Sequence, residues 1–324
     1  MLDVVVTCVR HGPEIATFPQ VRGYYLAKHL ARSGVDAEFR QLPLPSLQCR
    51  VVICSEYQCP IDYFQRKLEP SLSEIDADRM YCMADKSLVG KHRHFSQEYR
   101  DWFVATGGGV LCHLPDEKLE RHDKWIGVGV DLDVVPAPLG PSDRILFDFP
   151  HSSKEDAAPM FDVRVLDTVR ARLNGCVIAG SGPADSPVRG AFDEWVAYGQ
   201  EHTTYVGAAF HNLFAFVPGL DESMGLSLAE AQAAGACIVF SGWQVRDSML
   251  CPEATVHYRA GDPDSLAHAL IEARTRDRDR IRAQAADQFD FAAVAARTRA
   301  AIGLSRSGLA AQLGRVTQKG RRRS

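Results

Sequence analysis

The sequence lacks long hydrophobic runs. No apolar stretch in its 324 residues approaches the roughly 20 residues that a bilayer-spanning helix needs. Its first residues carry Asp3 where a secretory signal peptide would carry Lys or Arg. We therefore expect a cytoplasmic protein without a transmembrane segment.

Paired cysteine motifs are also missing. The nine cysteines are odd in number and scattered, and several lie in apolar runs such as residues 51–54. Cys49, Cys54 and Cys59 have no CxxC pair of the kind that clamps zinc. We expect reduced, buried thiols rather than a disulfide framework or a zinc site.

Acidic residues are absent from Gly303 onward, where six basic residues follow, so the preceding 302 residues carry a net charge of −10. Such a tail either stays solvated or contacts an anionic surface such as a membrane or nucleic acid. Over the whole chain the composition, with 46% hydrophobic and 24% charged residues, is that of a globular protein. A chain of this length predicts two domains of about 150 residues.

Strand-like and helix-like segments alternate along the chain. We predict strands at residues 2–9, 35–40, 49–55, 79–84, 110–113, 144–149, 176–179, 214–218 and 237–241. We predict helices at residues 21–32, 61–72, 96–105, 160–173, 191–199, 225–234 and 265–273, and one long final helix at 280–302. This order favours parallel sheets that are covered by helices on both faces.

A proline-rich stretch at residues 135–141 marks the expected domain boundary. The predicted fold class is α/β, with two Rossmann-like doubly wound domains that face a cleft. Residues 1–138 form the first domain and residues 139–302 the second, whose last helix can pack back on the first; residues 303–324 form the basic tail. Ligands of open α/β sheets bind at the carboxyl ends of the strands, which here face the cleft.

The most informative segment is residues 216–236. A strand ends at Pro218, an acidic loop follows, and a helix begins near Gly225 and stops at Gly235. The free amides of residues 224–227 would form the positive end of this helix, which suits a diphosphate. Glu230 could accept two hydrogen bonds from a ribose diol. The alternative is an ordinary helix whose acidic residues face solvent.

This segment resembles the glutamate-x7-glutamate signature of retaining GT-B glycosyltransferases of the family 4 type. Glu222-Ser223-Met224-Gly225-Leu226 through Glu230-Ala231 fits that signature, with Ser and Met in place of the usual Gly and Phe. The strand at residues 236–241 and the Gly-Asp-Pro run at residues 261–267 continue the likeness in the same order.

The resemblance implies transfer of a sugar from a UDP- or GDP-linked donor, with retained anomeric configuration and without a metal or other cofactor. It implies that Glu222 lies at the sugar and is catalytic, and that Glu230 binds the donor ribose. The donor diphosphate would be held at the backbone of Ser223, Met224, Gly225, Leu226 and Ser227.

Other positions follow from the same resemblance. Lys154 matches a donor-binding lysine, but no arginine stands at the partner position, for which His151 or Arg246 could substitute. In the first domain, Gly12 would belong to the loop that touches the donor, and Asp85 would be a second catalytic residue near the donor sugar.

Three alternatives stay open. Asp131 and Asp133 mimic the acid pair of metal-dependent transferases, but such spacing is common by chance. The missing arginine allows a non-catalytic module that binds nucleotide sugars or acts as a scaffold. The basic tail allows an enzyme that glycosylates modified DNA, as some phage-type transferases do. The acceptor stays open among glycans, lipids, small molecules and modified DNA.

Overall fold

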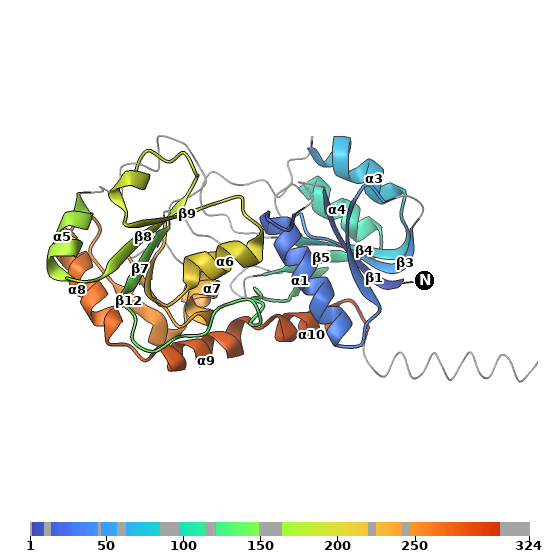
Figure 1. The fold of residues 1–324 in the computed structure, drawn as a ribbon. Coiled ribbons are helices and arrows are strands. Elements are labelled where there is room, and N and C mark those ends of the chain that lie inside the picture. Colours follow the sequence, from blue (N-terminus) through green and yellow to red (C-terminus); the bar gives the residue numbers. More distant parts are fainter. Residues whose placement is uncertain are drawn as a thin grey trace, which may run out of the picture.

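Two sheets with their helices lie side by side in the computed structural model (Figure 1). The structure describes residues 2–9, 14–44, 47–56, 63–84, 97–113, 119, 121–148, 164–219, 225–241 and 247–304. Within these residues the chain forms one six-stranded sheet, then a second, so that each sheet is built from a continuous part of the sequence.

The first sheet has the strand order β2-β1-β3-β4-β5-β6, and all its neighbours are parallel. Its strands are β1 (Leu2–Val9), β2 (Ala37–Leu42), β3 (Gln48–Cys54), β4 (Asp76–Ala84), β5 (Gly109–Cys112) and β6 (Asp123–Trp125). Parallel strands need crossover connections, which the intervening helices provide.

The second sheet is also parallel throughout, in the order β12-β11-β10-β7-β8-β9. Its strands are β7 (Arg144–Asp148), β8 (Val177–Gly182), β9 (Glu194–Ala197), β10 (Leu213–Val217), β11 (Cys237–Phe240) and β12 (Thr255–His257). Both sheets therefore have the parallel arrangement that the alternating pattern predicts, and the fold class is confirmed.

The helices cover both faces of each sheet, as Figure 1 shows. They are α1 (Phe18–Arg32), the π-helical turn η1 (Phe64–Leu68), α3 (Glu69–Ser73), α4 (Gln97–Ala105), α5 (Val165–Arg172), the 3-10 turn η3 (Arg189–Ala191), α6 (His202–Phe210), α7 (Leu226–Ala233), the 3-10 turns η4 (Asp247–Met249) and η5 (Pro252–Ala254), α8 (Pro263–Arg274), α9 (Arg278–Phe289) and α10 (Phe291–Ala301).

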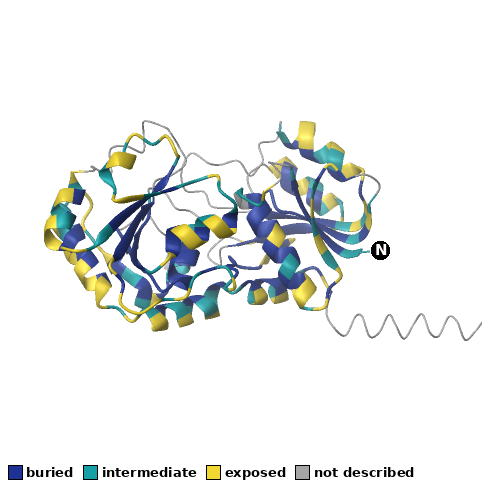
Figure 2. Ribbon diagram, viewed as in Figure 1, coloured by how far each residue is buried: buried dark blue, intermediate teal, exposed yellow. Residues whose placement is uncertain are grey.

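The cores lie between sheets and helices, where Figure 2 shows buried strands at the centre of both halves. On one face of the first sheet, α1 and α10 pack over Val4, Val6, Val51 and Ile53. On the other face, η1, α3 and α4 pack over residues such as Val5 and Val52. The alternation of neighbouring residues between two cores explains why these strands are continuous apolar runs.

The predicted final helix at 280–302 is wrong in one respect, because it is two helices. α9 ends at Phe289, Asp290 is extended at φ −59° and ψ 126°, and α10 begins at Phe291. The Asp290 side chain accepts a hydrogen bond from the Ala292 backbone N–H and so caps α10. The break lets α9 pack on α7 and lets α10 pack on α1.

The predicted helix at 191–199 is also wrong. This segment holds β9, which pairs with β8, and the following residues 202–210 form α6. The Trp195 ring lies over Gly180 of β8, where a Cβ would come within 2.6 Å of the ring. Tertiary pairing of this kind overrides the local preference of a short segment.

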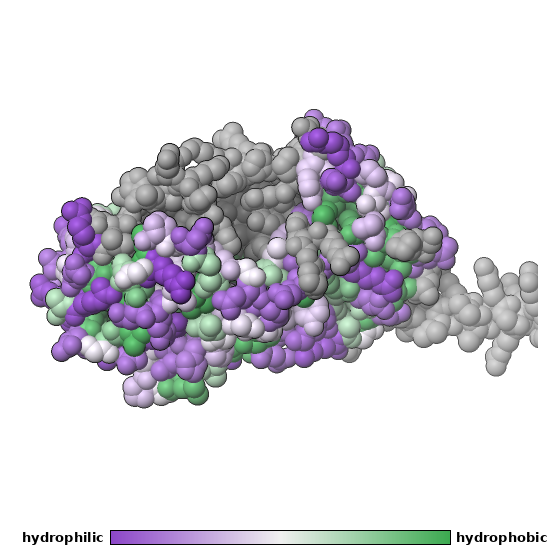
Figure 3. Space-filling view, turned by 45° about the horizontal axis from the view of Figure 1, so that its top comes forward, coloured by the Kyte–Doolittle hydropathy of each residue, from purple (hydrophilic) through white to green (hydrophobic). Residues whose placement is uncertain are grey.

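Among the described residues, no helix has the length and apolar character needed to cross a membrane. On the face shown in Figure 3, hydrophilic and hydrophobic residues alternate over the described surface.

Asp131 anchors the segment that follows the first sheet. Its carboxylate, 1% exposed, binds the Lys28 ammonium and lies 3.5 Å from the His29 Nε2 atom, both on α1. Burial alone would raise the pKa of Asp131, but hydrogen bonds from His29 and Lys28 outweigh it and lower that pKa to about 2. The Asp131 carboxylate therefore holds the segment after the first sheet on α1.

We predict that Asp131→Asn loses stability in a pH-dependent way. A carboxyl whose pKa is lowered by folding contributes stability above the unfolded pKa, near 4, and loses it as the pH falls toward 2. The wild type should exceed the variant by about 2 kcal/mol at pH 6 in urea unfolding, and this difference should shrink between pH 4 and pH 2.

The matched control is Asp133→Asn, two residues on, because the Asp133 side chain is 61% exposed and pairs with Arg32 at the surface. That change should cost little at any pH. An equal loss for Asp131→Asn at pH 6 and pH 3 would contradict the assignment of the charge to Asp131.

Candidate functional site

Helix α7 begins where the sequence predicts. Its N-cap is Gly225, with a left-handed φ of 38° and ψ of 62°. Because glycine has no side chain, the N-cap makes no side-chain hydrogen bond to the first turn. Gly235, with φ 81°, follows the helix as its C′ residue. The amides of Leu226 and Ser227 thus lie in the first turn, at the positive end of the helix.

The first turn of α7 faces the first domain. Leu226 packs against both the core of the second sheet and the core between α1 and the first sheet. α7 follows the carboxyl end of β10, and Leu226 lines one small cavity with Met83, near the end of β4, and His113, directly after β5. The carboxyl ends of the two sheets therefore meet here. This is the edge at which open α/β sheets bind ligands.

Glu230 lies in the second turn of α7, and it is not a solvent-facing acid. The residue is only 2% exposed. Its Oε1 atom lies 2.7 Å from the Nε2 atom of His202, the first residue of α6. Burial tends to lower the pKa of His202, but the Glu230 charge and hydrogen bond outweigh it and leave that pKa raised.

His202 also connects the two domains. Its backbone N–H donates to the carbonyl oxygen of Ile15 at 3.0 Å. Its Nδ1 atom lies 3.3 Å from the hydroxyl of Tyr25 on α1, and the two rings meet edge to face with centroids 5.4 Å apart. Sequence reasoning missed His202 and Tyr25, because nothing in the local pattern shows that α6 and α1 meet.

His113 is a second missed residue, at the carboxyl end of β5. It is 2% exposed, its Nδ1 atom contacts the Gly127 carbonyl at 3.1 Å, and its buried Nε2 atom has no hydrogen-bond partner among the described residues. Burial and the charge of Arg22 lower its pKa, so His113 is neutral at pH 7.

Leu226 and His113 line the same small cavity between the two domains, with Arg22 on α1. Its volume is about 10 Å³, which is close to the space of one water molecule. The free Nε2 atom of His113 is therefore a polar group held at the point where α7 meets the first domain. In the sequence, His113 comes directly after an apolar strand, and this position is the signal that could have identified it as a site residue.

Asp148 is a buried acid at the carboxyl end of β7. Its Oδ1 atom accepts hydrogen bonds from the Ser181 hydroxyl and the Tyr198 hydroxyl, both at 2.5 Å. These contacts join the ends of β7 and β8 to the residue that follows β9, so the edge of the second sheet carries a fixed, hydrogen-bonded carboxylate.

Several predicted residues lie outside the described residues. Of the predicted site, the structure describes Glu230, Gly225, Leu226 and Ser227. It does not describe Gly12, Asp85, His151, Lys154, Glu222, Ser223 or Met224, nor the alternative Arg246. Among the described residues, no group of three or more His, Cys, Asp or Glu side chains is arranged to hold a metal ion.

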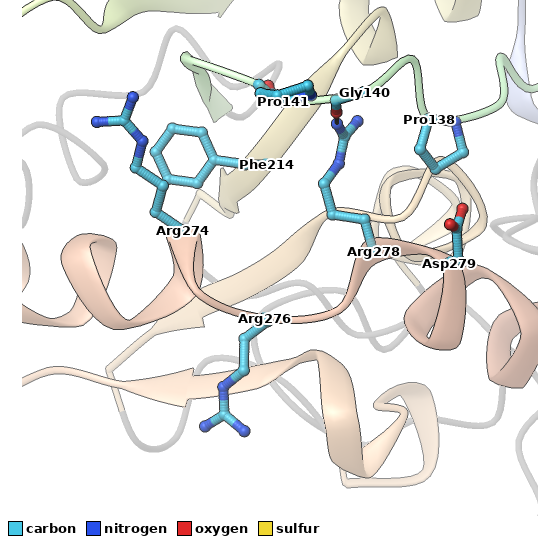
Figure 4. A pocket seen from close by; sticks show the side chains of 9 residues that line it. Pro138, Gly140, Pro141, Phe214, Arg274, Arg276, Arg278 and Asp279 are labelled. Atoms are coloured by element: carbon cyan, nitrogen blue, oxygen red, sulfur yellow. Dashed lines mark hydrogen bonds between the residues drawn. The ribbon is translucent and has the colours of Figure 1, made fainter.

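The larger cavity, about 400 Å³, lies at the opposite edge of the second sheet (Figure 4). It is lined by Phe214, near the start of β10, and by three arginines, Arg274, Arg276 and Arg278. Arg276 points away from the others and pairs with Glu272, while Arg278 binds the Gly140 carbonyl at 2.8 Å. This cavity therefore lies beside the domain-boundary stretch at residues 135–141, not at the carboxyl edge where α7 begins.

Comparison with known proteins identifies the fold. No protein-family model and no curated protein matches the sequence. Solved structures match along nearly the whole chain. Sucrose-phosphate synthase from Thermosynechococcus elongatus is 12% identical, with a TM-score of 0.56 over 99% of this chain and 100% of that one. The chain has the GT-B fold.

Two further GT-B structures agree. AviGT4, a glycosyltransferase of avilamycin A biosynthesis, is 14% identical, with a TM-score of 0.56 over 93% of this chain and 97% of its own. HepE of Anabaena, solved in complex with UDP, is 10% identical, with a TM-score of 0.55 over 94% of this chain and 100% of its own. At such identities the likeness establishes the architecture.

We predict that Gly225→Ala destabilises the protein by about 1–2 kcal/mol or more, because a left-handed φ strains any residue with a Cβ. The new Cβ would also come within 2.3 Å of the Leu228 side chain. Urea unfolding measures the loss.

Gly207→Ala is the matched control, since Gly207 lies inside α6 and a Cβ added there would meet no other atom within 4 Å. Alanine is more favourable than glycine inside a helix, so the free energy of unfolding of this variant should rise by about 0.5–1 kcal/mol. Equal effects of the two substitutions would show that the start of α7 is not constrained as described.

Proposed function

We propose that the protein is a retaining glycosyltransferase that moves a sugar from a UDP- or GDP-linked donor to an acceptor without a metal ion or other cofactor. The first domain, residues 1–138, would hold the acceptor. The second domain, residues 139–302, would hold the nucleotide sugar.

The strongest support comes from the position of α7. In a fold shared with glycosyltransferases, its amino end lies at the carboxyl edge of the second sheet and faces the first domain. A negatively charged diphosphate at this end would be stabilised by the backbone N–H groups and by the helix dipole. The expected diphosphate site comprises the backbone of Ser223, Met224, Gly225, Leu226 and Ser227.

Glu230 is proposed to bind the donor ribose. An ionised carboxylate has about four acceptor sites on its two oxygens, and one of them is used by His202. The remaining sites can accept both hydroxyl protons of a ribose diol. Because Glu230 lies one turn after the amino end of α7, the same helix would hold ribose and diphosphate together.

In the transfer step, the bond between the anomeric carbon and the diphosphate oxygen breaks while the acceptor oxygen bonds to that carbon on the same face. The acceptor hydroxyl proton passes to the leaving diphosphate. Negative charge grows on the diphosphate as the bond breaks, and the amides at the start of α7 would stabilise it. This electrostatic stabilisation by backbone amides would take the place of a metal ion.

The remaining roles stay proposals for residues that the structure does not describe. Glu222 and Asp85 are proposed to lie at the donor sugar as catalytic residues, and Lys154, His151 and Gly12 to contact the donor. His113 joins this set from the described residues, because its neutral, unpartnered Nε2 atom lies close to the start of α7.

A non-catalytic nucleotide-sugar module is the second candidate, because the expected arginine beside Lys154 is missing from the sequence. An enzyme that acts on modified DNA would instead depend on the basic tail at residues 303–324. Release of nucleotide from the donor separates an enzyme from a binding module. Salt-dependent DNA affinity that vanishes when the tail is deleted would support the DNA enzyme.

Titration calorimetry with UDP and GDP tests the binding part of this proposal. We expect the wild type to bind one of them and Glu230→Gln to bind about tenfold more weakly, a loss of about 1.4 kcal/mol, because a neutral amide is a poorer partner for the ribose hydroxyls. Glutamine can still accept the His202 hydrogen bond, so the fold should persist.

Glu222→Ala should keep nucleotide affinity and lose the release of UDP or GDP from a nucleotide sugar. Glu272→Gln, on the outer face of α8 with a side chain 54% exposed, is the control and should behave as wild type. Failure of the wild type to bind any nucleotide would refute the proposed function.

A further inference from the structure

His202 gives Glu230 its only hydrogen bond to a side chain among the described residues. The two groups lie 2.7 Å apart, and their side chains are 9% and 3% exposed. Ala229 and Ala231, the neighbours of Glu230 in α7, are apolar and buried. Gln232 donates to the carbonyl oxygens of Leu228 and Met249. Without His202, the Glu230 carboxylate would lack a fixed orientation.

Tyr25 sets the ring of His202. Its hydroxyl lies 3.3 Å from Nδ1 and can either donate to that atom or accept from it. When His202 is neutral, the Tyr25 hydroxyl donates to Nδ1 and the proton stays on Nε2, facing Glu230. When His202 is protonated, both ring nitrogens donate. In either state the Nε2 proton faces the carboxylate.

We propose that His202 is a positioning residue for donor binding, which fixes one oxygen of Glu230 and links it through Tyr25 to the first domain. This inference rests on the proposed role of Glu230 at the ribose. The held oxygen is Oε1, and the second oxygen, Oε2, is then presented in one orientation to the donor hydroxyls.

The contact of His202 with Glu230 lies within the second domain, whereas its contact with Tyr25 joins the two domains. His202 and Glu230 both belong to the second domain, on α6 and α7, whereas Tyr25 belongs to α1 of the first. With its side chain 3% exposed, Glu230 reaches a ribose only after neighbouring groups move. A movement of the first domain would break the Tyr25 contact and leave the His202–Glu230 contact intact.

Two substitutions at His202 separate these contacts. Gln places its amide N–H close to the Nε2 position, so His202→Gln can still donate to Glu230 but loses the Tyr25 contact. Asn places its polar atoms close to the Nδ1 position, so His202→Asn can still meet Tyr25 but does not reach Glu230. The pair is matched in polarity and charge.

We expect His202→Asn to raise the dissociation constant for UDP or GDP, and the KM for the donor, about tenfold with kcat changed less than twofold. His202→Gln, which loses only the Tyr25 contact, should stay within about threefold of the wild type. A merely structural role would not give this rescue by Gln or this split between KM and kcat. Circular dichroism tests whether each variant is folded.

The outcomes are distinct. If the wild type binds no nucleotide, the proposed function fails. If the wild type binds and Glu230→Gln weakens binding, but His202→Asn matches the wild type, the positioning role alone is overturned. Equal losses for His202→Asn and His202→Gln would overturn it too.

If His202→Asn does not fold, Tyr25→Phe carries the test, because it removes only the hydroxyl from a ring that stays packed on Phe291. Nitrogen NMR of the His202 ring should then show loss of the fixed tautomer, with nucleotide affinity two- to threefold weaker. An unchanged tautomer and affinity would refute the link to the first domain.

Discussion

The two parallel sheets meet at their carboxyl ends, and this arrangement determines where on the molecule a ligand can bind. Within each sheet the strands all end on the same side, because they are parallel, and ligands of open α/β sheets bind outside those ends. After the second sheet, the chain runs through α9 and then α10 back to the first domain. Phe291 and Val294 of α10 complete the core between α1 and the first sheet, and this packing holds the two domains together. Polar groups buried at the edge, Glu230 and His113 among them, are held by this packing.

The segment around α7 was predictable because local signals there agree with the fold. An apolar run forms β10, a glycine with left-handed backbone begins α7, and another glycine ends it. Small residues such as Ala229 and Ala233 let the helix pack closely in the core. Glu230 interrupts this apolar pattern, but the sequence alone leaves open whether this acid faces solvent or a ligand; its burial against His202 comes from the fold.

What the sequence could not indicate depends on tertiary contacts. β9 is only four residues long, and its place beside β8 is fixed by the Trp195 ring over Gly180. The break at Asp290 follows from the different helices on which α9 and α10 pack, not from a proline or glycine. His202 acquires its role because α1 and α7 meet at α6, and these elements are far apart in the sequence.

The electrostatics of the edge indicate why the start of α7 would matter for the proposed anionic donor. Asp148 and Glu230 are both buried acids of the second domain, and each is hydrogen-bonded: Asp148 by the Ser181 and Tyr198 hydroxyls, and Glu230 by His202. Hydroxyl donors satisfy Asp148 without cancelling its charge, whereas a protonated His202 would cancel that of Glu230. A diphosphate bound at this edge, as proposed, would depend on the backbone amides at the start of α7 for its stabilisation. Since the sequence has no arginine at the position expected beside Lys154, the proposed donor site would rely more on the amino end of α7 for that electrostatic stabilisation.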